Sequence, residues 1–152
     1  MRFGNEIDLS VATDAAFAFV ADQRNIPLWN YFVVDVIQKS GDGPAVGARY
    51  FQRRNTDSHH TAITQMEPGK SLTVETVDGA PVFRRHIEFL QTQGGTRLAD
   101  TWDITTGYPG VFELFAVRRI RRAVASNLEK LKRLLETGAV ELQDGRRVSV
   151  GS

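Results

Sequence analysis

Two charged residues flank the strongest late turn signal in the chain, Gly94-Gly95, and their types suit ligand chemistry. A hairpin centred on this turn places Ile87 opposite Asp100 and Arg85 opposite Trp102. Alternation along each strand then turns Arg85 and Asp100 toward the same apolar face, although a slip of one residue would reverse both faces. Arg85 could bind a carbonyl, carboxylate or phenolate, and Asp100 could act as a base. The alternative is an internal ion pair, or a pair at the open rim of the sheet.

Glu113 is a third candidate for proton transfer, because it falls on the apolar side of a predicted helix near its start. A desolvated carboxylate with a raised pKa could abstract a proton next to a carbonyl. The alternative, which we favour, is that Glu113 complements the helix dipole and reaches solvent. Asn127 falls on the same side and could bond a neighbouring carbonyl.

Several aromatic residues in the first half of the chain could shape a pocket. Trp29 offers a flat stacking wall, and Tyr50 could donate a hydrogen bond to a ligand oxygen. The alternative is that these residues are ordinary core. The residues that we predict to contact a ligand are Trp29, Phe32, Tyr50, Gln52, Ile63, Arg85, Asp100 and Trp102.

Metal and cofactor chemistry has little support in the sequence. Adjacent side chains on a strand point to opposite faces, so His59 and His60 cannot easily share one ion, and we expect His86 to face outward. The chain has no cysteine, which excludes disulfides, zinc ribbons and thiol nucleophiles. It also has no phosphate-binding glycine loop. We expect no metal site and no cofactor.

The composition predicts one soluble domain. A chain of 152 residues with 41% hydrophobic and 24% charged residues can build a core without disulfides or a structural metal. No stretch is apolar enough for a membrane span, and the first ten residues do not resemble a signal peptide, so we expect a cytoplasmic protein. The formal net charge of +1 argues against a nucleic-acid partner.

The charge is nevertheless concentrated near the end of the chain. Residues 110–152 hold nine Lys and Arg against five Asp and Glu, including the run Arg118-Arg119-Ile120-Arg121-Arg122. Phe112 and Phe115 fall among these arginines on a helical wheel. Such a face suits an anionic membrane surface, a phosphorylated ligand or an acidic partner. The alternatives, which we favour, are a solvated helix face and a bend near residue 115 that tucks both phenylalanines under a loop.

The pattern of the elements explains how these residues could meet. Alternation predicts a strand over residues 3–9, two short helices follow at residues 14–21 and 25–29, and Thr13 is the predicted N-cap of the first. Six further strands, separated by turn signals, are predicted over residues 33–39, 48–53, 61–66, 72–77, 82–90 and 96–105. Short connections between consecutive strands predict an antiparallel meander.

One long helix is predicted from about residue 110 to residue 136, with an apolar stripe that includes Leu114, Val117 and Leu131 and a stop at Gly138. We therefore expect a domain over residues 1–138 and a tail over residues 139–152, which is either loosely docked or a small hairpin. A curved sheet with one helix across its concave face encloses apolar volume, and any volume left unfilled is a pocket.

This pattern resembles the START-like superfamily, also called the SRPBCC or Bet v 1-like helix-grip fold, and within it the polyketide cyclase/dehydrase group. The resemblance covers roughly residues 3–136. It rests on Phe17 to Asp22, Ile26 to Asn30, Val46 to Tyr50, Met66 to Pro68, Gly94 to Leu98 and Leu128 to Lys132. It implies an α+β fold in which a curved antiparallel sheet of six or seven strands, two short helices and one long C-terminal helix enclose a cavity.

The resemblance leaves the function open, because the group has no universal catalytic signature. We expect a hydrophobic, partly oxygenated small molecule as the ligand. If the chain is an enzyme, a cofactor-free cyclisation or dehydration would use Arg85 or Tyr50 to polarise a carbonyl and Asp100 or Glu113 to move the proton. The alternative is a non-catalytic lipid or quinone carrier that makes weak contact with a membrane through its basic helix. A third hypothesis is an interaction module with a filled pocket. Either a monomer or a homodimer is compatible with the sequence.

Overall fold

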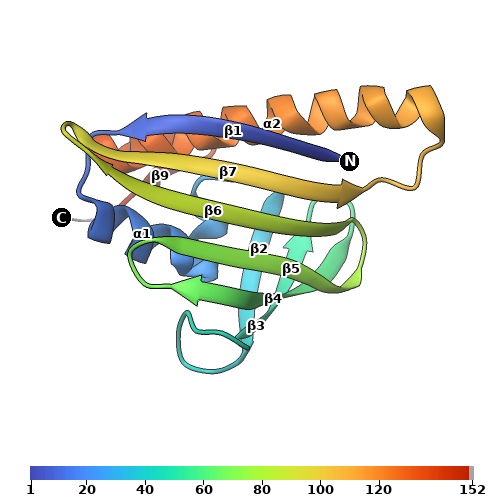
Figure 1. The fold of residues 1–152 in the computed structure, drawn as a ribbon, viewed down its shortest axis with the longest axis horizontal. Coiled ribbons are helices and arrows are strands. Elements are labelled where there is room, and N and C mark those ends of the chain that lie inside the picture. The colour runs from blue at the N-terminus through green and yellow to red at the C-terminus, as the bar shows by residue number, and fades with distance from the viewer. Residues whose placement is uncertain (151–152) are drawn as a thin grey trace.

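A computed structural model describes residues 1–150, which form one curved antiparallel sheet of seven strands with a long helix (Figure 1). The strand order is β1-β7-β6-β5-β4-β3-β2, so every strand except the first pairs with its neighbour in sequence. The strands are β1 (Arg2–Leu9), β2 (Val33–Ser40), β3 (Arg49–Arg54), β4 (Ser58–Glu67), β5 (Ser71–Gly79), β6 (Val82–Thr92) and β7 (Gly95–Thr105). The predicted meander and α+β class are confirmed.

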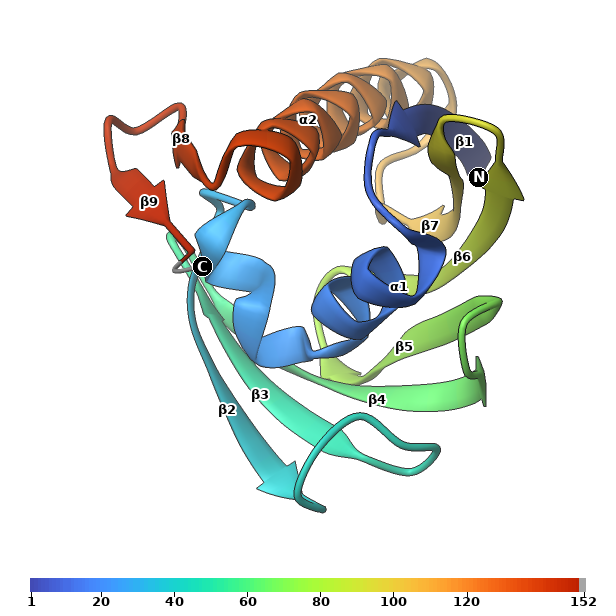
Figure 2. The same ribbon diagram turned by 90° about the vertical axis from the view of Figure 1, so that its left-hand side faces the viewer.

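Three helices complete the fold. The short helices α1 (Thr13–Ala21) and η1 (Gln23–Leu28) connect β1 to β2, and α2 (Gly110–Thr137) follows β7. Figure 2 shows the sheet curving around α1 and η1, with α2 lying across the open side. This is the arrangement expected of a helix-grip fold, in which the concave face of the sheet and one side of α2 enclose the interior.

The β6–β7 hairpin has the register predicted from its turn. Ile87 pairs with Asp100 and Arg85 pairs with Trp102. The turn is fixed by Gly95, whose φ of 144° is a conformation that other residues rarely adopt, and a Cβ there would collide with the carbonyl oxygen of Leu9. Because the turn cannot slip, Arg85 and Asp100 are held on the concave face.

The start of α1 differs from the prediction. The helix begins at Thr13 and its N-cap is Ala12, with no side-chain cap. The Thr13 hydroxyl instead shares a hydrogen bond of 3.0 Å with the Thr96 hydroxyl on β7, so a tertiary contact replaces the predicted cap.

The second half of α2 forms the packed end of the core. Leu128, Leu131 and Leu134 are buried against the sheet, and the helix ends at Gly138 with a φ of 83°, as predicted. The tail forms the hairpin that was one of its two predicted forms, with β8 (Ala139–Glu141) and β9 (Arg147–Ser149). Val140 and Leu142 are buried in the core.

The first turns of α2 differ from the prediction. Leu114, which was placed on the apolar stripe, is 38% exposed, and Phe112 and Phe115 are 65% and 61% exposed. The bend that was expected to cover the phenylalanines is absent from residues 110–137, which form one continuous helix that begins beyond the edge of the core. Figure 1 shows the start of α2 extending past the neighbouring strands.

Candidate functional site

A cavity of about 760 Å³ lies between the concave face of the sheet, η1 with the segment after it, and the middle of α2. This volume is in the range of small-molecule sites. Apolar and aromatic side chains form most of its wall, among them Ile26, Trp29, Phe32, Val74, Phe83, Ile87, Trp102, Ile104, Ile120 and Val124. The polar or charged side chains at the wall are Gln23, Asn30, Gln52, Arg54, Thr56, His59, Arg85, Arg119 and Asn127.

Arg85 and Asp100 form a buried bidentate ion pair on neighbouring strands. Arg85 Nε donates to Asp100 Oδ1 at 2.8 Å, and an Nη donates to Oδ2 at 2.6 Å. Their side chains are only 10% and 0% exposed. Trp102 Nε1 also donates to Asp100 Oδ2, at 3.1 Å. The sequence left open whether Arg85 and Asp100 form an internal ion pair or face a ligand. They form an internal ion pair, and Arg85 also lines the cavity.

The pair fixes the guanidinium of Arg85 between two indole rings. Its central carbon lies 4.7 Å from the centre of the Trp102 ring and 5.5 Å from that of Trp29. A bidentate contact engages one edge of the guanidinium fork, which leaves the donors on the other edge directed away from Asp100. Arg85 is thus a preorganised donor in an aromatic setting.

Asp100 supports Arg85 rather than lining the cavity. It is 1% exposed, both of its oxygens accept hydrogen bonds, and it does not contribute to the cavity wall. A carboxylate in this position orients the guanidinium and has no direct path to a ligand proton.

A second polar pair, His59 and Gln52, faces the cavity from β4 and β3, where the two residues lie opposite each other. His59 Nδ1 lies 3.2 Å from the Ala80 carbonyl oxygen, and Nε2 lies 3.0 Å from Gln52 Oε1. Both partner atoms are oxygens that can only accept, so His59 donates through whichever ring nitrogen carries its proton. Burial lowers the pKa of His59, although the bond to Ala80 opposes this shift.

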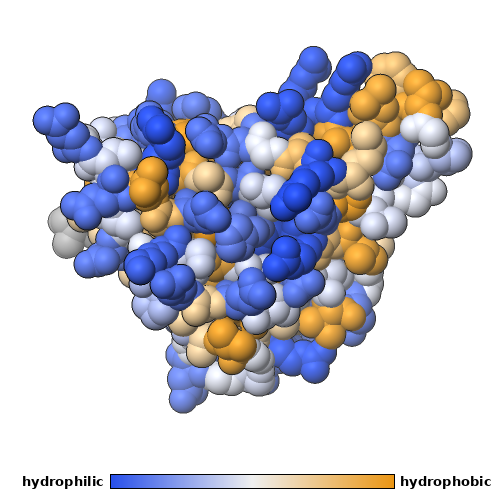
Figure 3. All heavy atoms as spheres, in the orientation of Figure 1, coloured by the Kyte–Doolittle hydropathy of each residue, from blue (hydrophilic) through white to orange (hydrophobic). Residues whose placement is uncertain are grey.

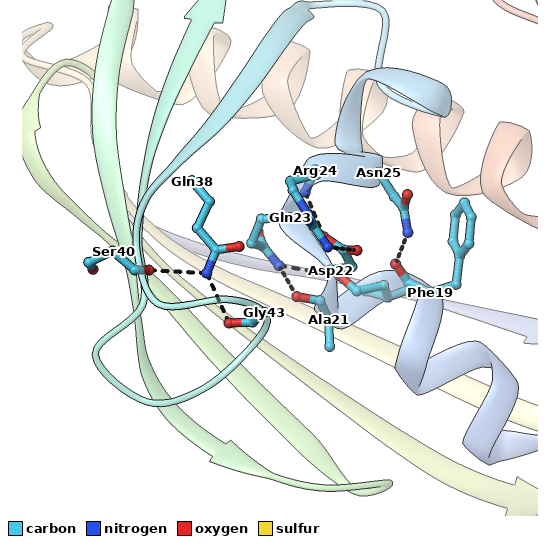
Figure 4. A network of polar contacts seen from close by, with 10 residues as sticks. Phe19, Ala21, Asp22, Gln23, Arg24, Asn25, Gln38, Ser40 and Gly43 are labelled. Carbon is cyan, nitrogen blue, oxygen red and sulfur yellow. Dashed lines mark hydrogen bonds and ion pairs between the residues drawn. The ribbon is translucent and has the colours of Figure 1, made fainter.

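Polar contacts at the junction of α1 and η1 hold one end of the cavity in place (Figure 4). The buried Gln23 amide donates to the carbonyls of Val20 and Ala21, at 3.2 and 3.1 Å. Asp22 caps η1 by accepting from the backbone N–H of Arg24, and it also pairs with the Arg24 guanidinium, which lowers the pKa of Asp22. Figure 4 shows these contacts with Gln23 between the helical segment and the sheet.

The structure separates the predicted site residues into two groups. Five of them line the cavity, namely Trp29, Phe32, Gln52, Arg85 and Trp102. Tyr50 and Ile63 are fully buried and lie outside the wall. Burial raises the pKa of Tyr50, whose hydroxyl has no hydrogen-bond partner within residues 1–150. Glu113 is partly exposed in the first turn of α2, also outside the wall.

Sequence reasoning missed His59 as a cavity residue and considered it only as a metal ligand. The signal that could have identified it is the turn between β3 and β4, which pairs Gln52 with His59 and so gives both the same face. His60 faces the other way and bonds Asp78 at 2.7 Å. Asn127, which was expected to bond a carbonyl, instead lines the cavity and accepts from the Gln143 side chain at 3.3 Å.

The wall carries charge of one sign only. Arg54, Arg85 and Arg119 contribute to it, and across residues 1–150 no Asp or Glu does. Arg54 pairs with Asp57 at 3.4 Å and Arg85 with Asp100, whereas Arg119 has no ion pair within the described chain. A cavity with aromatic walls and cationic donors favours apolar molecules that carry an acidic or strongly accepting oxygen group.

Residues 1–150 contain neither a metal site nor a membrane-spanning helix. Among residues 1–150, no three His, Asp or Glu side chains come together as a metal site would require. In the same range, none of the helices combines the length and the apolar character that crossing a bilayer demands.

Comparison with solved structures identifies the same fold in proteins of very different sequence. A START superfamily protein from Mycobacterium smegmatis has a TM-score of 0.72 at 12% identity, covering 88% of this chain and 98% of its own. One half of the di-domain ARO/CYC StfQ of the steffimycin biosynthetic pathway has a TM-score of 0.72 at 14% identity, covering 89% of this chain and 50% of that one. The Aha1 dimer from Colwellia psychrerythraea has a TM-score of 0.68 at 18% identity, covering 91% and 98%.

At the level of sequence, no curated protein matches the chain. A family profile described as "Polyketide cyclase / dehydrase and lipid transport" does match, over residues 2–136. The match extends from β1 to the last turn of α2 and includes every element that forms the cavity. The START-like resemblance seen in the sequence is confirmed, and the chain belongs to the polyketide cyclase/dehydrase and lipid transport family.

Proposed function

We propose that this protein binds an apolar small molecule that carries an acidic or strongly accepting oxygen group, and that Arg85 anchors that group. The observation that carries the proposal is the composition of the cavity wall, to which aromatic residues and three arginines contribute and, among residues 1–150, no carboxylate does. A ring system or acyl chain would bury its apolar surface against Trp29, Phe83 and Trp102.

Arg85 suits this role because it is already oriented before a ligand arrives. Asp100 fixes one edge of the guanidinium and Trp102 packs against its face, so binding costs little side-chain entropy. The bidentate geometry of the free edge matches a carboxylate, an enolate or a pair of neighbouring carbonyls. His59 and Gln52 offer a second, neutral polar contact.

Binding rather than turnover is the function that the geometry supports best. Asp100 and Glu113, the two carboxylates predicted to move a proton, lie outside the cavity wall. A cyclisation or dehydration in this cavity would use Arg85 to polarise a carbonyl. Since no carboxylate among residues 1–150 lines the cavity, His59 would be the proton acceptor. Turnover of a polyketide-like chain that is lost in a His59→Gln variant with intact binding would establish the enzymatic alternative.

The binding proposal can be tested through the two tryptophans of the chain, because both Trp29 and Trp102 line the cavity. Anthraquinone-2-carboxylate, which is apolar, oxygenated and anionic, is expected to quench tryptophan fluorescence saturably. Its methyl ester, which has the same rings and no charge, is expected to bind at least about tenfold more weakly, since about 1.4 kcal/mol of ionic interaction is lost.

Replacing the ion pair with apolar residues, as Arg85→Met with Asp100→Leu, should remove the preference for the acid while keeping the fold, because no charge is left unpaired. Arg97→Met, on the exposed face of β7, is the matched control and should keep the preference. The proposal fails if neither probe quenches saturably and nothing apolar is extracted from the natively purified protein.

A further inference from the structure

Exposed apolar side chains lie at the start of α2 and just before it, and apart from Tyr108 they line neither the core nor the cavity. We call the residues Tyr108, Val111, Phe112, Leu114 and Phe115 the entry patch; they are 60%, 58%, 65%, 38% and 61% exposed. Figure 3 shows hydrophobic residues gathered at the end of the molecule where α2 begins in Figure 1. Single exposed apolar residues are common, but a contiguous group with two phenylalanines and a tyrosine marks an interaction site.

The local structure keeps this patch outward. Buried residues of α2 begin only at Val117, so the first two turns of the helix extend beyond the sheet. Phe112 and Phe115 are three positions apart and therefore share one face of the helix. Val111, Phe112, Leu114 and Phe115 belong to the helix itself, and Tyr108 lies in the segment just before it.

Positive charge follows the patch directly along the helix. Arg118 and Arg119 lie three and four positions after Phe115, and Arg122 continues the same face one turn later. Together with Arg121, these arginines are exposed, and none of the four is in an ion pair within residues 1–150. Glu113 is the one acidic residue of α2 before Glu129.

From this juxtaposition we propose that the entry patch docks the protein onto an anionic lipid bilayer. Aromatic and aliphatic side chains would insert at the boundary between headgroups and acyl chains, and the arginines would meet the lipid phosphates. The surface of an anionic bilayer accommodates a helix that presents apolar side chains at its end and cations directly after them on the same face. A second copy of this chain is a poorer occupant, because a twofold contact through this face would bring the unpaired arginines of both copies together.

The patch also adjoins the mouth of the cavity. Tyr108 and Arg119 belong to the cavity wall and are exposed, as is Thr56 in the β3–β4 turn. A bilayer bound at the entry patch would therefore lie next to the opening. Transfer of a ligand between bilayer and cavity rests on the proposed function, whereas docking itself does not.

The test is flotation of the intact protein with vesicles of phosphatidylcholine alone and of phosphatidylcholine with one-quarter phosphatidylserine. Binding is expected on the anionic vesicles, with at least a tenfold loss in affinity on neutral vesicles or between low and high salt. Phe112→Ser with Phe115→Ser should cause a similar loss. Arg118→Gln with Arg122→Gln should abolish the difference between the two vesicle types.

Matched controls use equally exposed residues away from the patch. Leu90→Ser, at a residue 61% exposed on β6, and Arg133→Gln, in the last third of α2, should each bind as the unmodified protein does. Docking is overturned if neither the unmodified protein nor any variant floats with anionic vesicles. It is equally overturned if light scattering shows a dimer that the double Phe variant dissociates, which would assign the patch to a second copy.

Anthraquinone quenching in the same double Phe variant separates the two proposals. Loss of flotation with unchanged quenching is a defect in bilayer docking alone. Loss of quenching with unchanged flotation is a defect in ligand binding by the cavity alone.

Discussion

The interior has two ends that are built from the same helix and the same sheet but filled differently. At the packed end, Leu128, Leu131 and Leu134 of α2 are buried in the core together with Leu9, Leu98 and Phe89, and none of them lines the cavity. At the hollow end, Ala123 and Asn127 of α2 line the cavity together with Arg85 and Trp102 of the sheet. Short or polar side chains of α2 therefore border open space, whereas leucines one or two turns later along the helix are buried in the core. The difference shows that the cavity depends on residue choice along α2 as well as on the curvature of the sheet.

The largest effect is expected from breaking the ion pair at the hollow end. Asp100→Asn leaves a buried guanidinium without its carboxylate, which should lower the free energy of unfolding by about 3–5 kcal/mol. Urea denaturation measures this. Asp8→Asn breaks the exposed pair with Arg97, whose side chains are 67% and 48% exposed, and should lower the free energy of unfolding far less. Equal losses in the two variants would contradict a special role for the buried pair.

Truncation of an aliphatic side chain should distinguish the two ends directly. Leu131→Ala at the packed end, where the side chain is fully buried, should cost about 3 kcal/mol because it creates a new cavity. Ile120→Ala at the hollow end should cost about 1 kcal/mol, since Ile120 already borders open space. Thermal denaturation of both variants tests the comparison, and a reversed order would mean that the cavity is collapsed in solution.

Filling the hollow end should affect binding more than stability. Ala123→Phe places a ring into the cavity, and we expect the free energy of unfolding to change by less than about 1.5 kcal/mol. Quenching by anthraquinone-2-carboxylate should weaken at least about tenfold, which corresponds to about 1.4 kcal/mol. Ala125→Phe, on a part of α2 outside the cavity wall, is the control for the added ring. Unchanged binding in Ala123→Phe would place the probe elsewhere.

The smallest effect concerns the neutral pair at the hollow end. Burial lowers the pKa of His59 below its ordinary value of 6.5, so the unfolded chain takes up the proton first as the pH falls. The stability linked to this group is full above pH 6.5 and is lost as the pH falls from there toward the lowered pKa. Because one proton is involved, the free energy of unfolding cannot fall by more than about 1.4 kcal/mol per pH unit.

Urea denaturation at pH 7.5 and pH 5.5 measures this loss, and His59→Gln should reduce it. His86→Gln, at a partly exposed histidine on the outer face of β6, should leave the contribution of His59 in place. The same pH dependence in His59→Gln and in the unmodified protein would show that His59 is not the group responsible.

The sequence predicted the fold and part of the site because their signals are local. Alternation and the Gly94-Gly95 turn determine the register of β6 and β7, which is why Arg85, Asp100 and Trp102 were placed on the right face. Tyr50 was assigned to the buried side of its strand, but alternation along a strand does not tell a residue of the closed core from one that borders the cavity.

Other features depend on the sum of many side chains and could not be predicted. Whether the space beside α2 is filled is decided by volumes contributed from the sheet, η1 and α2 together. The exposure of Phe112 and Phe115 follows from where the sheet ends relative to α2, and periodicity within the helix carries no information about that distance.

The pairing of β1 with β7 also dictates an order of assembly. The five hairpins from β2 to β7 join strands that are adjacent in sequence, and each can form locally. β1 must wait for a partner far along the chain, since Met1 bonds Ile104 across 103 positions. Long-range pairing of this kind slows folding because the loop entropy is lost before the contacts form. We therefore expect strands β2 to β7 to pair before β1 joins the sheet at β7 and α2 closes over it, so that the cavity is the last part of the molecule to acquire its shape.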